Sequence, residues 1–387
     1  MPLLHDSARP HGGLLVKSVE EYIVPWVRES EPYSARHMDF ASENPHLVRM
    51  MSNENLLPPS PKVLEAILEA ARSANLYPDS GPELRRRLGE LAGLTADHVV
   101  LGNGSTDIIN TVIHTFIAPG DEAVISVPTF PMYETRVRIA GGKSVLVPMT
   151  SDFYWDIEAI LGAVTPKTKL FFVCSPNNPT GNQIREDDLR RILATGVPTF
   201  YDEAYYELED QVVSRASWIK EYPHLMVNRT FSKAFGLAGL RIGYLLCEAS
   251  LANYLNRVKI PWNVNLLALA AARAALDDLD DQQVKRETIL AGREYICNEV
   301  NRIPGLRAFP SQGNFVLIDA SALGQTSSEI MQAMIARGIF IRPMSGHNMP
   351  QGFIRITVGT PEQNRFFIEA FKGYVEETRK ASIHTAR

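Results

Sequence analysis

Cysteine is scarce in this chain of 387 residues, and so are long apolar runs. The three cysteines, Cys174, Cys247 and Cys297, lie far apart without a CxxC pair, so they suit neither a disulfide framework nor a thiolate metal site. The longest apolar run, residues 266–276, contains Arg273 and is too short to span a bilayer. The first residues lack the basic stretch and apolar core of a signal peptide. We therefore expect a cytoplasmic protein without a membrane segment.

An excess of one charge sign is also missing. Lys and Arg total 39 and Asp and Glu total 44, for a net charge of −5. This mildly acidic balance gives no electrostatic reason to expect nucleic acid or an anionic membrane as a partner. The nine histidines include no His-Glu-x-x-His pattern or other close-set cluster, so no metal is expected.

Short apolar runs that alternate with helical patterns predict an α/β fold. This alternation is typical of a mostly parallel sheet with helices on both faces. After about residue 285 the pattern changes to helix, strand (315–318), helix, strand (353–358), helix, which predicts a smaller α+β domain. We expect an N-terminal segment (1–45) that contributes to the small domain, a large domain (46–275) and a small C-terminal domain (276–387). The predicted strands of the large sheet are 99–101, 123–127, 144–147, 170–173, 198–201, 225–228 and 242–246.

Two strand ends carry turns that suit ligand binding. Leu101-Gly-Asn-Gly-Ser-Thr-Asp107 leads from a strand into a helix, and the N–H groups at such a helix start suit a phosphate. Taken alone, an ordinary capped turn explains this motif about as well. Ser175-Pro-Asn-Asn-Pro-Thr-Gly181 holds two amides rigidly at the sheet edge where α/β proteins bind ligands. We interpret this second motif as functional.

Two further strand ends carry charged side chains. Asp202 ends an apolar strand, and a buried carboxylate needs a cationic partner, either a metal or a protonated heterocycle. The missing histidine cluster disfavours a metal. Lys233 lies in the apolar, glycine-rich segment 228–244, where partial desolvation lowers the pKa of a lysine and suits it to form a Schiff base with a carbonyl.

Together these motifs describe one ligand with a phosphate, an aldehyde, a protonated ring nitrogen and a phenolic oxygen. Pyridoxal 5'-phosphate has all four groups, whereas nicotinamide and flavin cofactors do not. We expect Lys233 to bind its aldehyde, Asp202 its ring nitrogen, and Asn178 and Tyr205 its phenolic oxygen. The residues predicted to hold its phosphate are Gly104, Ser105, Thr106, Thr230, Ser232 and Arg241.

At this point the sequence resembles the fold-type I, class I/II pyridoxal-phosphate aminotransferases across essentially the whole chain, and within them the histidinol-phosphate aminotransferase branch. The resemblance implies the fold-type I architecture: a large domain with a mostly parallel sheet flanked by helices, plus a smaller α+β domain. The motifs that carry it include Ser52-Asn-Glu-Asn55, Tyr77-Pro-Asp79, Asp202-Glu-Ala-Tyr205, Thr230-Phe-Ser-Lys-Ala-Phe235, Pro261-Trp-Asn-Val-Asn265 and Ile354-Arg-Ile-Thr-Val-Gly-Thr360.

The resemblance also implies roles for individual residues. Lys233 would carry the Schiff base and move the proton at the substrate Cα, with Asp202 and Tyr205 as its catalytic partners. Phe130 would stack on the cofactor ring, with Tyr133 as the alternative. Tyr77 would reach the cofactor phosphate of a neighbouring subunit, which requires a homodimer. Arg355 and Asn178 would bind the substrate, and Arg342 would add a second positive charge for a substrate phosphate. Tyr33 would form a lid over the substrate.

Two departures from the branch pattern leave the substrate open. Pro32-Tyr33 is followed by Ser-Ala-Arg instead of continuing to Pro-Gly, and Leu56 replaces the proline after Asn55. We expect a transaminase that moves an amino group between histidinol phosphate or an amino acid and 2-oxoglutarate. The alternatives are an aromatic or broad-specificity aminotransferase, an enzyme of secondary metabolism, a threonine-phosphate decarboxylase and a non-catalytic binding protein of the same fold.

Overall fold

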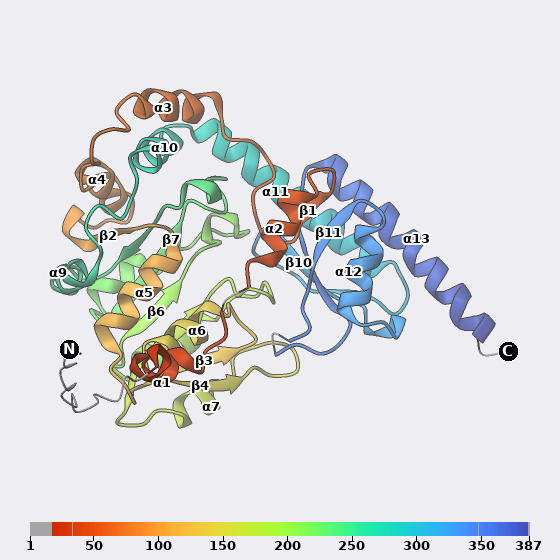
Figure 1. Ribbon diagram of the computed structural model, residues 1–387, viewed down its shortest axis with the longest axis horizontal. Coiled ribbons are helices and arrows are strands. Elements are labelled where there is room, and N and C mark those ends of the chain that lie inside the picture. The colour runs from red at the N-terminus through yellow and green to blue at the C-terminus, as the bar shows by residue number, and fades with distance from the viewer. Residues whose placement is uncertain (1–17, 33, 347, 386–387) are drawn as a thin grey trace, which may run out of the picture.

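A computed structural model describes residues 18–32, 34–346 and 348–385 (Figure 1). Two sheets organise the chain, and they lie side by side with the long helix α11 (Leu279–Asn301) leading from one to the other. This arrangement confirms the predicted α/β class. No described helix is both long enough and apolar enough to cross a membrane.

The large sheet has seven strands in the order β2-β8-β7-β6-β5-β3-β4. Strand β8 runs antiparallel to both of its neighbours, and the pairs from β7 to β4 are parallel. Each strand overlaps a run predicted from the sequence. The strands are β2 (Val99–Gly102), β3 (Glu122–Val127), β4 (Lys143–Pro148), β5 (Thr168–Cys174), β6 (Thr199–Asp202), β7 (Leu225–Thr230) and β8 (Gly243–Leu246).

Alternate side chains of these strands enter two different apolar cores, which explains why the runs are apolar throughout. In β5, for example, Phe171 and Val173 face one core and Phe172 and Cys174 face the other. The first core is covered by α3 (Pro61–Ala71), α4 (Pro82–Leu91), α7 (Ile157–Gly162), α8 (Glu186–Leu193) and α10 (Leu266–Leu276). The second is covered by α5 (Ser105–Phe116), α6 (Met132–Ile139) and α9 (Ala249–Val258).

The small sheet has five strands in the order β1-β11-β12-β10-β9. The sequence prediction identified β10 and β12 but not the other three strands. β1 lies within the predicted large-domain range 46–275, yet it pairs in parallel with β11, so it belongs to the small sheet. The strands are β1 (Val48–Met50), β9 (Arg307–Ala308), β10 (Phe315–Asp319), β11 (Ile339–Pro343) and β12 (Phe353–Thr357), and the flanking helices are α2 (Arg36–Glu43), α12 (Ser327–Ile335) and α13 (Pro361–Thr385).

Candidate active site

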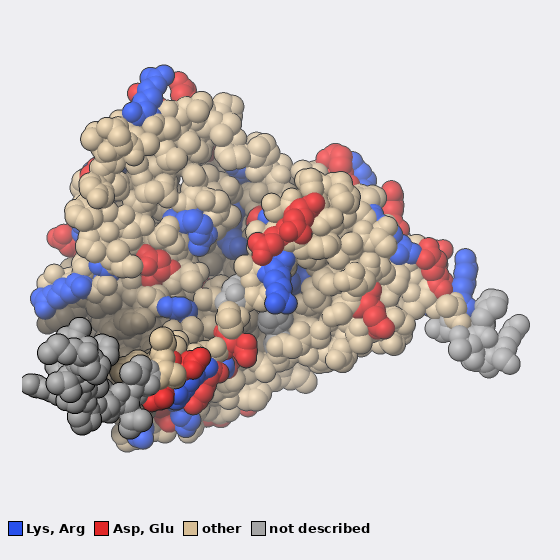
Figure 2. All heavy atoms as spheres, in the orientation of Figure 1, with Lys and Arg blue, Asp and Glu red and all other residues tan. Residues whose placement is uncertain are grey.

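Parallel pairing brings the carboxyl ends of β5, β6 and β7 to one edge of the large sheet, facing the small sheet. A cavity of about 610 Å³ lies there, and the molecule is hollowed between its two halves, with basic side chains gathered at the hollow (Figure 2). Most of the predicted site residues line this cavity: Ser105, Thr106, Phe130, Asn178, Asp202, Tyr205, Thr230, Ser232, Lys233, Arg241, Arg342 and Arg355.

Two predicted residues do not line the cavity, and a third cannot be placed. Gly104 lies directly behind the lining, where a Cβ atom would stand 2.5 Å from Nη2 of Arg241. Tyr77 is 82% exposed and stacks on Trp262 with ring centroids 5.0 Å apart. Tyr33 lies outside the described residues.

Lys233 points its amine at the segment that follows β1. Nζ donates to the backbone carbonyl of Asn53 at 3.0 Å and lies 3.4 Å from that of Ser52. Burial and the positive charge of Arg355 lower the pKa of Lys233 to about 8. A lysine with such a pKa holds an appreciable neutral fraction near pH 7, so it can attack a carbonyl and exchange protons.

Asp202 lies at the end of β6 and is 3% exposed. Its Oδ1 accepts from Asn228 at 2.8 Å and from the backbone N–H of Ala204 at 3.2 Å, and its Oδ2 accepts from the Tyr133 hydroxyl at 2.5 Å. Burial raises the pKa of Asp202, and these hydrogen bonds oppose the rise. A carboxylate held in this way suits a cationic ring nitrogen.

The start of α5 is built for an anion. Gly104, the residue before the helix, has φ +75° and ψ 169° and provides no side-chain cap, in contrast to Ser60 before α3 and Asn265 before α10. The first N–H groups of α5 therefore remain available beside the hydroxyls of Ser105 and Thr106. Thr230, Ser232 and Arg241 line the same cavity.

Two arginines of the small sheet face each other across β11 and β12. Arg342 and Arg355 are Cα partners in this antiparallel pair, and both line the cavity. Arg355 donates to Oδ1 of Asn178 at 2.5 Å and to the Met51 carbonyl at 2.8 Å. The side chain of Arg342 makes no hydrogen bond or ion pair within the described residues, although its charge acts on His37. Like charges directly opposite each other destabilise a sheet, so this pair indicates an anionic ligand.

Sequence reasoning missed several residues of the site. Tyr133, predicted as an alternative stacking ring, is instead fully buried and donates to Asp202. Asn53, quoted only as part of a motif, donates from Nδ2 to the Tyr205 hydroxyl at 3.0 Å. His37 of α2 lines the cavity, and partial burial together with Arg342 and Arg355 lowers its pKa from 6.5, so the ring is neutral at pH 7. Each of these contacts depends on the packing of residues far apart in the sequence, so no local motif predicts it.

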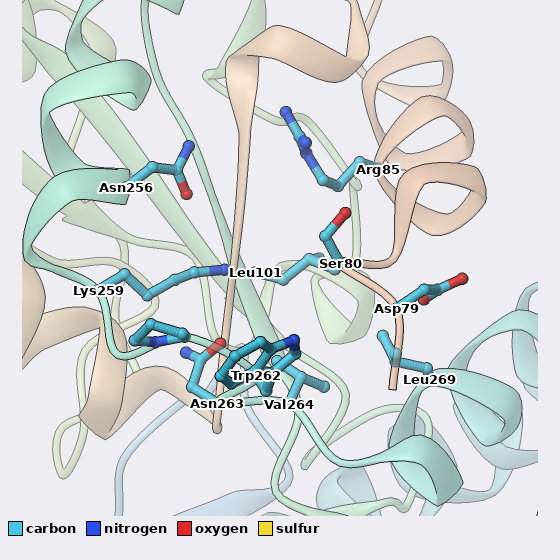
Figure 3. Close-up of a pocket in the computed structure, with 11 residues that line it drawn as sticks. Asp79, Ser80, Arg85, Leu101, Asn256, Lys259, Trp262, Asn263, Val264 and Leu269 are labelled. Atoms are coloured by element: carbon cyan, nitrogen blue, oxygen red, sulfur yellow. The ribbon is translucent and has the colours of Figure 1, made fainter. Parts of the chain in front are cut away.

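A second cavity of about 420 Å³ lies beside β2 and contains none of the predicted cofactor residues. Figure 3 shows Lys259 extending toward Leu101, with Arg85 on the α4 side and Trp262 on the loop before α10. Burial and the neighbouring Arg85 lower the pKa of Lys259. Trp262, which lines this cavity, also contacts the exposed Tyr77. Among the described residues there is no group of three or more His, Cys, Asp or Glu side chains that could hold a metal ion.

Comparison with known proteins agrees with this geometry. Residues 45–371 match the family aminotransferase class I and II. The chain belongs to this family. Among similar aminotransferases, the histidinol-phosphate aminotransferase of Methanosarcina mazei is 40% identical over 330 residues, which cover 84% of this chain and 88% of that protein. The histidinol-phosphate aminotransferase 2 of Pseudomonas aeruginosa is 40% identical over 332 residues, covering 84% and 88% of the two chains.

Solved aminotransferase structures have the same fold. The histidinol-phosphate aminotransferase of Sinorhizobium meliloti in complex with pyridoxal 5'-phosphate superposes with a TM-score of 0.81 at 26% identity, covering 92% of this chain and 98% of that one. The aspartate aminotransferase of Thermus thermophilus with maleate superposes with a TM-score of 0.80 at 23% identity, covering 92% and 99%, and this likeness shows the fold alone.

The aminotransferase described here is therefore an enzyme that depends on pyridoxal 5'-phosphate. Its cavity fits that cofactor by the chemistry of its donors. The uncapped start of α5 suits the phosphate, the amine of Lys233 suits the aldehyde, and the buried Asp202 suits the ring nitrogen. When bound, the cofactor supplies an electron sink for the bond that breaks at the substrate Cα.

Proposed function

We propose that this aminotransferase transfers an amino group from histidinol phosphate, or from an amino acid, to 2-oxoglutarate. The observation that carries the substrate proposal is the pair Arg342 and Arg355, which face each other in the cavity. Both proposed substrates are anionic, one a phosphate ester and the other a dicarboxylate. A planar guanidinium binds either kind of anion through two parallel hydrogen bonds.

The two arginines differ in whether other residues already hold their side chains in place. Arg355 is already held by Asn178 and the Met51 carbonyl, so it is oriented before any substrate arrives. We assign Arg355 to an anionic group of either substrate, the phosphate of histidinol phosphate or a carboxylate of 2-oxoglutarate. Arg342 has no such partners within the described residues, and we assign it as a second positive charge for the phosphate of histidinol phosphate. His37 lies near both arginines, and because its pKa is lowered it adds no further positive charge at pH 7.

In this proposal the amine of Lys233 would hold the cofactor at its aldehyde carbon, and the same amine would move the proton at the substrate Cα. Its depressed pKa suits both acceptance and return of that proton. Asp202 keeps the ring nitrogen protonated, because its three donors favour the carboxylate form. Tyr205 and the free amide of Asn178 bind the phenolic oxygen, and Phe130 covers the ring.

The names of the relatives support histidinol phosphate as the amino donor, because several proteins 35–40% identical to this chain are histidinol-phosphate aminotransferases. The threonine-phosphate decarboxylase of Porphyromonas gingivalis superposes with a TM-score of 0.74 at only 23% identity, so its likeness supports the fold and not that activity.

The proposal includes a homodimer with shared active sites and a cytoplasmic location. Tyr77 lies outside its own cavity, is 82% exposed and stacks on Trp262, which is 63% exposed, as expected for a surface that another subunit covers. Leu76 and Ile260, close to these two residues in the sequence, are exposed apolar residues as well. The scattered, unpaired cysteines are the argument for a reducing compartment.

A half-reaction experiment tests the substrate. Purified enzyme with bound cofactor is mixed with a single amine, and the visible absorbance of the cofactor is followed. We expect histidinol phosphate to react fastest in the wild type, and Arg342→Ala to slow it about 10- to 100-fold, because one charge-assisted contact is lost. The reaction of Arg342→Ala with phenylalanine should be slower than that of the wild type by less than about threefold.

Two variants serve as controls in that experiment. Lys233→Ala should abolish the reaction with every amine, and Arg342→Lys should recover only part of the rate, because a lysine retains the charge without the planar fork. Equal losses for histidinol phosphate and phenylalanine in Arg342→Ala would show that the substrate is an ordinary amino acid. Normal turnover by Lys233→Ala would contradict the role of the lysine.

A further inference from the structure

Asn53 connects the cofactor side of the cavity to the small sheet. It is 1% exposed and has a left-handed backbone with φ +53°. Its backbone N–H donates to Oγ1 of Thr357 at 2.9 Å, and its carbonyl accepts from Lys233 at 3.0 Å and from Asn314 at 3.0 Å. These ties fix the Asn53 side chain in one place, between β12 and the cavity.

That side chain determines where the proton of Tyr205 can go. Nδ2 of Asn53 donates to the Tyr205 hydroxyl oxygen at 3.0 Å, and Oδ1 of Asn53 faces the hydroxyl of Thr357 at 3.4 Å. Because the tyrosine oxygen accepts from the amide, its own O–H bond must point away from Asn53. Tyr205 is 4% exposed and lines the cavity, so the proton is directed at a ligand there.

We propose that Asn53 is a positioning residue that aims the Tyr205 hydroxyl at the phenolic oxygen of the cofactor, and that it thereby sets the acidity of the bound cofactor. This inference rests on the proposed role of Tyr205. A hydrogen bond donated to the phenolic oxygen draws electron density from it and stabilises its anionic form. The bound cofactor then gives up its proton at a lower pH than it would without the donor.

The charged and titratable groups around Tyr205 are few. Burial is the main cause that raises the pKa of Tyr205, Arg355 and the hydrogen bond from Asn53 oppose the rise, and Cys174 and Asp202 add to it. The amine of Lys233 lies 5.7 Å from the centre of the tyrosine ring. None of these groups accepts a hydrogen bond from the tyrosine hydroxyl in the structure, so the Asn53 amide is the contact that fixes its direction.

The test titrates the visible absorption band of the resting enzyme with its cofactor. Asn53→Gly removes the amide and tolerates the left-handed backbone, because glycine adopts positive φ without strain. We expect the pH midpoint of the band to rise by about one unit in Asn53→Gly and by a similar amount in Tyr205→Phe. The double variant should show no further rise, since both changes remove the same hydrogen bond.

Two further variants sharpen the result. Asn53→Asp retains the side-chain volume and also tolerates positive φ, but a carboxylate accepts the tyrosine proton, so the midpoint should rise at least as far as in Asn53→Gly. Asn55→Ala removes a different tie of the same segment, the bond from Asn55 to the Ala234 carbonyl, and should leave the midpoint unchanged.

An Asn53→Gly enzyme that titrates like the wild type overturns the inference, and so do shifts that add in the double variant. A shift in Asn55→Ala equal to that of Asn53→Gly does the same, because it would indicate loosening of the segment. A wild-type enzyme without a visible band after addition of the cofactor would contradict the role of Lys233 as well, which separates failure of the proposed function from failure of this inference.

Discussion

At the scale of single residues, the ionisable groups of the site are tuned by burial more than by ion pairs. Burial is the main cause that lowers the pKa of Lys233 and raises that of Asp202, so each is moved toward its neutral form. Hydrogen bonds then oppose the effect on Asp202 but not on Lys233. The result is a carboxylate beside a weakly basic amine, which is the combination that proton transfer at a substrate Cα requires.

Glu207, a half-buried carboxylate outside the cavity, links stability to pH. Burial raises the pKa of Glu207 to about 8, and Oε2 of Glu207 has no hydrogen-bond partner within the described residues. The folded chain therefore retains a proton that the unfolded chain loses near pH 4.5. This stabilising contribution is complete below pH 4.5 and is lost as the pH rises toward 8.

We expect the free energy of unfolding of the wild type to fall by about 1–2 kcal/mol more than that of Glu207→Gln between pH 5 and pH 8. Denaturant titrations at several pH values measure this difference, and other ionisable groups cancel in the comparison. Parallel curves for the two proteins would show that Glu207 is ionised in the fold, in spite of its burial near Arg229.

The burial of Asp202 and Lys233 could be predicted from the sequence, because it follows from local pattern. Asp202 and Lys233 each stand at the end of an apolar run, so their neighbours along the chain already indicate burial. The contact between Asn53 and Tyr205 could not be predicted, because it joins residues 152 apart through the packing of two sheets. Arg342 and Arg355 lie opposite each other only because of the register between β11 and β12, which also could not be predicted from the sequence.

At the scale of elements, the turn before α5 combines a backbone requirement with a steric one. The φ of +75° and ψ of 169° at Gly104 belong to a region that is open essentially to glycine alone. A side chain there would also meet the guanidinium of Arg241 at 2.5 Å. The helix start and the arginine can therefore both face one phosphate only because residue 104 lacks a Cβ atom.

Gly104→Ala should weaken binding of the cofactor by about 5- to 150-fold, because strain of about 1–3 kcal/mol falls on the turn proposed to hold its phosphate. Spectroscopic titration of the cofactor-free enzyme measures this affinity. Gly196→Ala is the matched control: its φ is +74° and no atom lies within 4 Å of the added Cβ, so it should lower stability without a change in affinity. Equal affinity in both variants would contradict the assignment of the phosphate to α5.

The short strands mark the limit of prediction at this scale. The seven strands of the large sheet were found because both of their faces are buried and their runs are apolar. β1 has three residues, too few to show a period, and its partner β11 lies near the other end of the chain. Its assignment to the small sheet, and with it the placement of the Ser52–Asn55 segment over Lys233, follows only from the fold.

At the scale of the whole molecule, the proposed shared site can be tested by mixing defective subunits. In the proposal Tyr77 serves the site of the neighbouring subunit, whereas Lys233 serves its own. A dimer of one Tyr77→Ala chain and one Lys233→Ala chain then contains one complete site. We expect each variant alone to be impaired, and a mixture allowed to exchange subunits to regain about a quarter of the wild-type activity, because half of the dimers are mixed and each has one good site.

The control for that experiment pairs Lys233→Ala with Asp202→Ala. Both residues serve the same site, so their mixed dimer has no complete site and should show no recovery. Absence of recovery with Tyr77→Ala as well would place the tyrosine outside the neighbouring site.

The order in which the chain is synthesised has a consequence for how this enzyme matures. All strands of the large sheet lie between residues 99 and 246, so the pocket for the cofactor can form while the C-terminal third is still being translated. The carbonyl of Met51, by contrast, must wait for Arg355, which comes 304 residues later. Pairings over such separations form late. We therefore expect a nascent chain to complete the strands that carry the proposed cofactor residues before it adds Arg355, the proposed substrate residue.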